Sequence, residues 1–266
     1  MDRDLRKVIA FPCEEANLLG TLDSAPGTTA LLVVSGGNEV RAGAHRGMAM
    51  LAAKVASAGH PVFRFDRRGV GDSEGENGSW ESAGPDLAAA LTTLRREQPQ
   101  LTHVVALGNC DAAAALARFG RDAGVDALVL TNPWTGGDAD GLPPAAAIRQ
   151  RYGQRLRDPA LWRRALTGRL AWGKLARGIA KSLAPNPSNL PDRMAAELNA
   201  FPGPLTLVLA RGDATAIGFR ACWTSAAFAP VRDRATLVEL DTASHSFQHA
   251  ADAAALEAAV LAALTT

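Results

Sequence analysis

The sequence has few cysteines and no long apolar run, which argues against several large classes of protein. Its 266 residues include only three cysteines, and this odd, widely spaced set (Cys13, Cys110 and Cys222) argues against a disulfide framework or a zinc site and fits a reducing compartment. No apolar run approaches the ~20 residues that a membrane-spanning helix needs. Residues 1–7 are mostly charged and no apolar stretch follows them, so we expect no signal peptide and a cytoplasmic protein.

An excess of charge of one sign is also missing. The formal net charge is +1, which gives no argument for a nucleic-acid partner. The Gly-x-Gly segment from Gly69 to Gly71 does not open directly into a helix pattern, so it is not a nucleotide fingerprint, and we expect no cofactor and no metal. With 47% hydrophobic residues the chain can build one large core, and its length does not require a second domain.

Short apolar runs alternate with longer helical patterns along most of the chain. This rhythm predicts a mostly parallel sheet with crossover helices, opened by a hairpin. The expected strands cover residues 8–11, 17–22, 30–34, 61–65, 103–107, 126–131, 204–210 and 235–240. The expected helices cover residues 45–58, 84–98, 110–120 and 250–264.

The rhythm breaks after the sixth expected strand, where helical pieces punctuated by proline replace the strand patterns. We therefore divide the chain into a core, residues 1–133 and 202–266, and a helical cap, residues 134–201, over the carboxyl edge of the sheet. Ten basic residues crowd part of this cap: Arg149, Arg151, Arg155, Arg157, Arg163, Arg164, Arg169, Lys174, Arg177 and Lys181. They form either a solvated helix face or a surface for an anionic partner, such as an acyl carrier protein, coenzyme A or lipid headgroups.

The segment from Gly108 to Ala113 predicts a reactive cysteine. A strand runs into Gly108, Cys110 follows one residue later, and small residues then open a helix, which is the strand–turn–helix context of a G-x-S-x-G nucleophile elbow. The turn is sharp, so small residues must flank the nucleophile, and Gly108 and Ala112 do so. A helix N-terminus also favours a thiolate. The alternative is a small buried cysteine of no chemical role.

The partners of such a nucleophile follow in the order nucleophile, acid, base. Asp213 comes after the strand that ends at residue 210, and His245 lies between the last strand and the last helix. A histidine can move the thiol proton and a carboxylate can orient the imidazole. We therefore predict a Cys110–His245–Asp213 triad. Asp241 is the second choice as acid and His249 as base, while His60 and His103 begin strands at the opposite edge.

Two backbone amides are expected to stabilise an oxyanion. One belongs to Asp111, the residue after the nucleophile, and the other to Gly37 in the loop after the third expected strand. The alternative for the glycine pair at residues 36–37 is a plain turn. Residues 65–73, with the pattern D-x-R-G-x-G-x-S, are interpreted as a scaffold loop beneath the elbow.

These segments together resemble a family of α/β-hydrolases found beside exosortase A genes in exopolysaccharide and protein-sorting clusters, the first of two hydrolase types there. The likeness spans nearly the whole chain. It is carried by residues 36–37, 41–46, 65–73, 108–113, 132–134, 155–156, 162, 213–216 and 219. Relatives tend to have Pro-Gln where this chain has Asn38-Glu39, and because proline has no N–H to donate, this supports Gly37 as the oxyanion donor.

The resemblance implies an α/β-hydrolase fold, here an eight-stranded, mostly parallel sheet with a helical cap. It also implies a hydrolase, and we predict that Asn38, Arg41, His45 and Trp134 contact the substrate. A thiolate accepts acyl groups readily from thioesters, so we expect a small acyl ester or thioester, hydrolysed or transferred through an acyl-Cys110 intermediate. Two alternatives stay open. One is a lactone or carboxylic-ester hydrolase of the dienelactone hydrolase type, which shares the elbow cysteine, and the other is a non-catalytic accessory protein.

Overall fold

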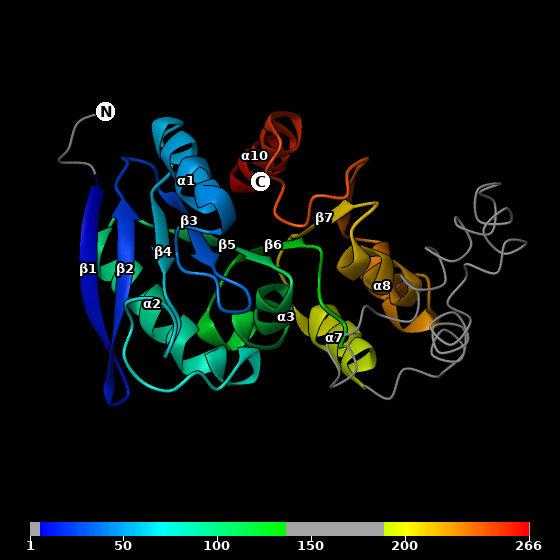
Figure 1. Ribbon diagram of the computed structural model, residues 1–266, viewed down its shortest axis with the longest axis horizontal. Helices are drawn as coiled ribbons and strands as arrows, with labels where there is room; N and C mark the ends of the chain where they lie inside the picture. Colours follow the sequence, from blue (N-terminus) through cyan, green and yellow to red (C-terminus); the bar gives the residue numbers. More distant parts are fainter. Residues whose placement is uncertain (1–5, 137–188, 266) are drawn as a thin grey trace, which may run out of the picture.

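The computed structural model describes residues 6–136 and 189–265, and these build an eight-stranded sheet between two layers of helices (Figure 1). The order across the sheet is β1-β2-β4-β3-β5-β6-β7-β8. The strands are β1 (Arg6–Cys13), β2 (Ala16–Asp23), β3 (Thr29–Val34), β4 (Val62–Phe65), β5 (His103–Asn109), β6 (Ala127–Thr131), β7 (Leu205–Ala210) and β8 (Thr236–Leu240). β2 pairs antiparallel with both of its neighbours, β1 and β4, and every other neighbouring pair of these strands is parallel, so the predicted mostly parallel sheet is confirmed.

Alternating side chains of the central strands separate the core into two halves. In β3, Leu31 and Val33 face α1 (Gly47–Ser57) and α10 (Ala250–Leu264), whereas Leu32 and Val34 face the opposite layer. That second layer contains α2 (Ala83–Glu97), α3 (Asp111–Ala123), α7 (Leu190–Ala200) and α8 (Ala214–Trp223). Because the strands are buried on both faces, they are continuous apolar runs, which is why the sequence shows them clearly.

Two helices differ from the expectation. The helix expected from residue 45 begins as α1 at Gly47, after a short 3-10 turn (Ala44–Arg46) in which His45 and Arg46 have left-handed φ values of 51° and 59°. The sequence analysis missed α8 altogether, because it treated Asp213 only as a loop acid. The Asp213 carboxylate accepts a hydrogen bond from the Ala216 amide and so also caps α8, and an aspartate before a small-residue run is a recognisable helix start.

The predicted cap falls largely on residues that the structure does not describe. All ten basic residues between positions 149 and 181 lie outside the described ranges. The part of the predicted cap that is described includes one of the expected helical pieces, α7 (Leu190–Ala200), which packs against α3 and buries Met194 and Leu198 in the core. The division into core and cap stays a prediction. In the ranges that are described, no helix is both long and apolar enough to cross a membrane.

Candidate active site

Cys110 occupies a strained turn between β5 and α3. Its φ of 59° and ψ of −121° belong to a region that residues with a side chain rarely adopt, and such strain persists only where the surroundings enforce it. The turn brings β5 and α3 so close that a Cβ on Gly108 would lie 2.8 Å from the backbone of Ala112. A glycine is therefore required at position 108, as the elbow pattern predicts.

The backbone of Cys110 is held from the next strand of the sheet. Its N–H donates to the carbonyl of Thr131 at 3.0 Å, and its carbonyl accepts from the N–H of Trp134 at 3.1 Å. The half-buried Trp134 ring packs edge-on against Trp80, with 6.1 Å between the ring centroids. Trp134, predicted to contact substrate, thus also supports the elbow.

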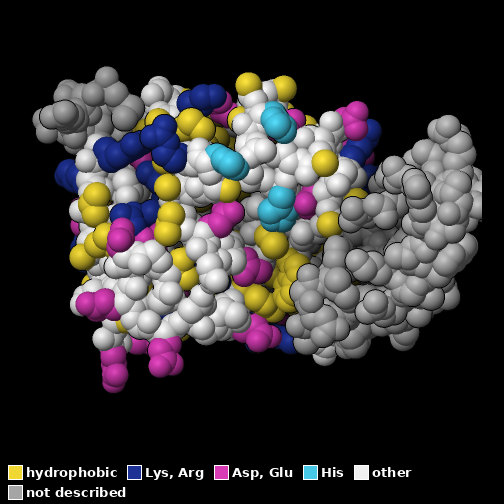
Figure 2. Space-filling model, in the orientation of Figure 1, with side chains coloured by type: hydrophobic (Ala, Val, Ile, Leu, Met, Phe, Trp, Pro, Cys, Tyr) yellow, Lys and Arg dark blue, Asp and Glu magenta, His cyan; other side chains and the backbone are white. Residues whose placement is uncertain are grey.

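The structure brings Asp213 and His245 together with Cys110. Oδ1 of Asp213 lies 3.0 Å from Nδ1 of His245, and Cys110 interacts with the same imidazole. The hydrogen bond to Asp213, and next the interaction with Cys110, raise the pKa of His245 from 6.5 to about 10 although burial opposes this. Asp213 is itself buried. Figure 2 shows histidine side chains gathered on one face of the described part of the molecule.

The two predicted oxyanion donors, the backbone amides of Asp111 and Gly37, have different surroundings. Asp111 is the first residue of α3, so its amide has no acceptor within the helix. Gly37, with a φ of 54°, donates its N–H to Oδ1 of the Asp111 side chain at 2.5 Å. The buried Arg67 donates to the Gly37 carbonyl at 2.5 Å and lies 3.7 Å from Oδ2 of Asp111. A carboxylate therefore occupies one of the two amides that the sequence analysis assigns to the oxyanion.

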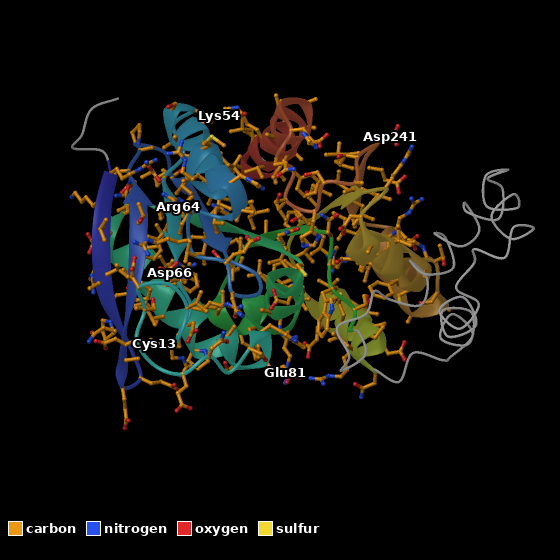
Figure 3. The ribbon with its side chains drawn as sticks, viewed as in Figure 1. Cys13, Lys54, Arg64, Asp66, Glu81 and Asp241 are labelled. Carbon is orange, nitrogen blue, oxygen red and sulfur yellow. The ribbon has the colours of Figure 1, made fainter. Side chains whose placement is uncertain are left out.

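The other residues predicted to contact the substrate are Asn38, Arg41 and His45, which lie between β3 and α1. Arg41 pairs with the fully buried Asp66 and, at 2.9 Å, with Asp72, so its charge already stabilises the loop after β4. Figure 3 labels Arg64, which belongs to β4, and Asp66, the first residue of that loop. Asn38 accepts a hydrogen bond from Asn77 at 2.8 Å and His45 is exposed. A role of Asn38, Arg41 and His45 in substrate binding stays a prediction.

The second-choice acid and base lie apart from this arrangement. Asp241 and His249 are exposed, and it is Asp213 that accepts the hydrogen bond from the His245 imidazole. Figure 3 shows Asp241 on the side of the molecule away from the β1–β2 hairpin. The sequence analysis gave no role to Asn109 and Asn132, yet both side-chain amides donate to the carbonyl of His245. Their signal in the sequence is modest: each ends or follows a strand at the predicted site.

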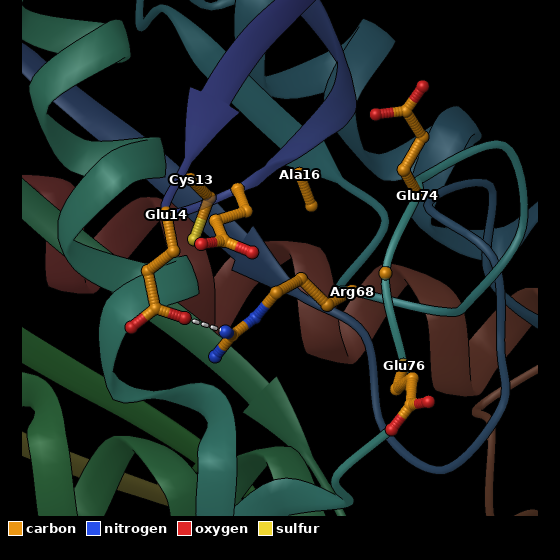
Figure 4. Close-up of a pocket in the computed structure, with 8 residues that line it drawn as sticks. Cys13, Glu14, Ala16, Arg68, Glu74 and Glu76 are labelled. Carbon is orange, nitrogen blue, oxygen red and sulfur yellow. Dashed lines mark hydrogen bonds and ion pairs between the residues drawn. The ribbon is translucent and has the colours of Figure 1, made fainter.

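A separate pocket opens beside the β1–β2 hairpin (Figure 4). It has a volume of about 650 Å³ and contains no member of the predicted triad; it is lined by Cys13, Glu14, Glu15, Ala16, Arg68, Glu74, Gly75 and Glu76. Arg68 pairs with Glu14 across it. Among residues 6–136 and 189–265, no three His, Cys, Asp or Glu side chains are grouped so that they could hold a metal ion.

Comparisons with known proteins agree with this architecture. The chain is similar to the Pyrococcus furiosus esterase, with a TM-score of 0.67, 16% identity, and 100% of this chain and 93% of that chain covered. It is similar to dienelactone hydrolase from Anabaena variabilis, with a TM-score of 0.62, 15% identity, and coverage of 98% and 96%. It is also similar to a thioesterase domain from the curacin biosynthetic pathway, with a TM-score of 0.58, 14% identity, and coverage of 96% and 99%.

At these identities the structural likeness establishes the fold alone. No curated protein matches the chain. The family model described as the alpha/beta hydrolase family matches residues 31–259, which include the elbow, the acid and the histidine loop. With a match over most of its length and the fold described above, the chain belongs to the alpha/beta hydrolase family.

Proposed function

We propose that this protein is an ester or thioester hydrolase, or an acyltransferase, that works through an acyl-Cys110 intermediate. One observation carries the proposal: the His245 imidazole lies 3.0 Å from the Asp213 carboxylate and interacts with the sulfur of Cys110, whose turn presents it at the start of α3. A nucleophile, a base and an orienting acid linked in this way are the requirements of covalent acyl transfer.

In the first half of the reaction, Cys110 attacks the carbonyl carbon as its thiolate, with its proton held by His245 as an imidazolium, and a C–S bond forms. The carbonyl electron pair moves to oxygen, where the amides of Asp111 and Gly37 would donate to it once the Asp111 carboxylate has moved away. The tetrahedral adduct then expels the alcohol or thiol, and His245 supplies the proton that the leaving group needs. Its raised pKa of about 10 keeps that proton available at neutral pH.

In the second half, a water or an acceptor alcohol attacks the acyl-Cys110 thioester. His245 takes the proton of the attacking group, the C–S bond breaks, and the sulfur returns to its starting state. A thiolate exchanges acyl groups with thioesters easily, which supports a thioester substrate. The resemblance to hydrolases encoded beside exosortase A genes, in clusters with activating ligases and carrier proteins, supports an acyl group bound to a carrier protein or coenzyme A.

The test is a panel of acyl-coenzyme A thioesters and p-nitrophenyl esters of increasing acyl length, followed by intact mass measurement during turnover. We expect turnover and an added acyl mass that peptide mapping places on Cys110. The Cys110→Ala variant should show neither, and the Cys13→Ala variant should behave like the wild type. Turnover without any Cys110 adduct, and unchanged in Cys110→Ala, would remove the proposal.

A lactone hydrolase is the second candidate, because the elbow carries a cysteine and the fold is similar to that of dienelactone hydrolase. In a lactone the leaving group stays tethered to the acyl group. An acyl-enzyme formed from a lactone would therefore carry the whole mass of the substrate, whereas one formed from an open ester carries only the acyl part. Adding an enol-lactone to the same panel separates the two candidates by mass.

A further inference from the structure

The residues at the end of β6 contact the chain around the predicted nucleophile. Thr131 accepts the N–H of Cys110, and Trp134 donates its own N–H to the carbonyl of Cys110. Asn132 lies between these two contacts in the sequence and is completely buried. Its φ is 41°, in the left-handed region where asparagine is one of the few side-chain-bearing residues that are common.

The side chain of Asn132 reaches the chain around the other two members of the predicted triad. Its Nδ2 donates to the carbonyl oxygen of His245 at 3.1 Å. Its Oδ1 accepts from the N–H of Ala210, at the end of β7, at 2.9 Å. The carbonyl of Ala210 in turn accepts the N–H of Asp213 at 3.0 Å. One amide thus joins the loop of the base to the turn of the acid.

The chemistry of the two contacts requires an amide. The His245 carbonyl can only accept and the Ala210 N–H can only donate, so the residue between them needs one donor and one acceptor, and the amide can face only one way. An ionised aspartate has no donor for His245, and an apolar residue would leave the buried N–H of Ala210 without a partner, at a cost of about 1–3 kcal/mol.

A second amide reinforces the first. Nδ2 of Asn109, the residue before the nucleophile, also donates to the His245 carbonyl, at 3.3 Å. Its Oδ1 accepts from the hydroxyl of Thr131 at 2.8 Å, which holds the amide in place. A carbonyl oxygen has two lone pairs, so two donors from two neighbouring strands can hold it at once.

We propose that Asn132, assisted by Asn109, is a positioning residue that sets the register of His245 between Asp213 and Cys110. The inference rests on the proposed function, because the exact position of His245 matters for catalysis only if His245 acts on Cys110. The two amides fix the main chain of His245, while the bond from Asp213 to Nδ1 fixes the rotation of its ring. With the backbone held and Nδ1 engaged, Nε2 is the nitrogen left for the sulfur.

The decisive variant is Asn132→Asp. The carboxylate has the shape of the amide and keeps an acceptor for Ala210, but at neutral pH it has no donor for His245. Asn132→Ala removes both contacts, and Asn109→Ala removes only the second donor. Asn199→Ala changes an exposed asparagine of α7 and serves as the matched control.

Two readouts separate positioning from general loss of structure. The first is the rate at which iodoacetamide labels Cys110, read by mass spectrometry at several pH values, which needs no substrate. The second is kcat and KM for the best ester or thioester of the panel. In Asn132→Asp and Asn132→Ala we expect kcat to fall about 10- to 100-fold with KM unchanged, because a small displacement of a catalytic group has effects of this size.

Labelling of Cys110 near neutral pH should slow by about tenfold in the same variants, because the sulfur loses its imidazole partner. Asn109→Ala should show the same two changes at a few-fold, and Asn199→Ala neither. Wild-type labelling and kcat in folded Asn132→Asp would overturn the inference. If the Asn132 variants do not fold, Asn109→Ala decides in the same way. A wild type that turns over no ester would count against the proposed function only, since the labelling still tests the positioning of His245.

Discussion

Cys13 and Cys110 are two thiols of one protein in opposite surroundings. Cys13 is 3% exposed, and its Sγ donates directly to Oδ1 of Asp86 at 3.4 Å. Burial, and then the charge of Asp86, raise the pKa of Cys13 to about 11. Cys110 is half-buried, lies at the start of a helix, and interacts with the imidazole of His245.

An aspartate influences the reactivity of both thiols. Its effect depends on whether it contacts the thiol directly or acts through another residue. Asp86 acts on the Cys13 sulfur directly, so the like charges oppose ionisation of the thiol. Asp213 acts on Cys110 through His245, so the carboxylate stabilises an imidazolium, and the imidazolium presents a positive charge to the sulfur. Under the proposed mechanism, an aspartate therefore makes Cys13 unreactive and another, acting through His245, prepares Cys110 for attack.

The largest expected difference is in turnover. Cys110→Ala should lower kcat/KM for the best panel substrate by at least about 10³-fold, because binding and oxyanion donors alone leave little catalysis. Cys13→Ala should leave it within twofold. Cys110→Ser should retain little activity, since a hydroxyl needs a stronger base. Steady-state kinetics of the three variants, with far-UV circular dichroism for folding, measure this; an active Cys110→Ala would mean that the elbow is not catalytic.

The second difference is in thiol reactivity. At pH 7 a thiol with the pKa of Cys13, about 11, is ionised in roughly one molecule in 10,000, and its burial slows access further. Burial also raises the pKa of Cys222. We therefore expect iodoacetamide to label Cys110 at least about 100-fold faster than Cys13 in the folded protein. Peptide mapping at successive times measures the three labelling rates. Equal rates would show that the different surroundings of Cys13 and Cys110 do not control their reactivity.

The features that the sequence predicted are those encoded locally or by order along the chain. The strand positions follow from short apolar runs, and the triad follows from three residues that each come after a strand in a set order. The contacts that complete the site join residues far apart: Gly37 and Asp111 are 74 positions apart, and Asn132 and His245 are 113. Nothing in the local pattern around Asn132 shows that its amide meets a loop so distant, because that meeting depends on how β6, β7 and the last loop pack.

The third prediction concerns how the stability that the Asp213–His245 pair contributes changes with pH. The pKa of His245 is raised from 6.5 to about 10, so its protonated form stabilises the native state fully below pH 6.5, and that stabilisation is lost as pH rises through about 10. Asp213→Asn removes the main cause of the shift. The free energy of unfolding of this variant should fall furthest below that of the wild type near pH 6.5, and the gap should narrow toward pH 10. Urea unfolding at four pH values measures it.

The matched control for this experiment is Asp241→Asn, which neutralises an exposed acid on the histidine loop. It should give a curve parallel to that of the wild type. The asparagine in Asp213→Asn can still accept from the Ala216 amide, which Asp213 does at 3.0 Å, so the cap of α8 is kept. A gap for Asp213→Asn that stays constant with pH would therefore show that the carboxylate does not act through the His245 imidazole.

The smallest expected effect concerns the side chain next to the nucleophile. Asp111 places a carboxylate on the Gly37 amide, where the proposed reaction develops an oxyanion, so its charge must move before that amide can act. Nη1 of the buried Arg67 has no hydrogen-bond partner in the described part of the chain, and its Nη2 lies 3.7 Å from Oδ2 of Asp111. Asp111→Ala should free the amide and raise kcat/KM for a small p-nitrophenyl ester by a few-fold. Asp111→Asn, which keeps the contact without the charge, should fall between. A loss of activity in Asp111→Ala, with Asp111→Asn at the wild-type level, would mean that the contact organises the glycine loop and that the amide is useful only while it is held.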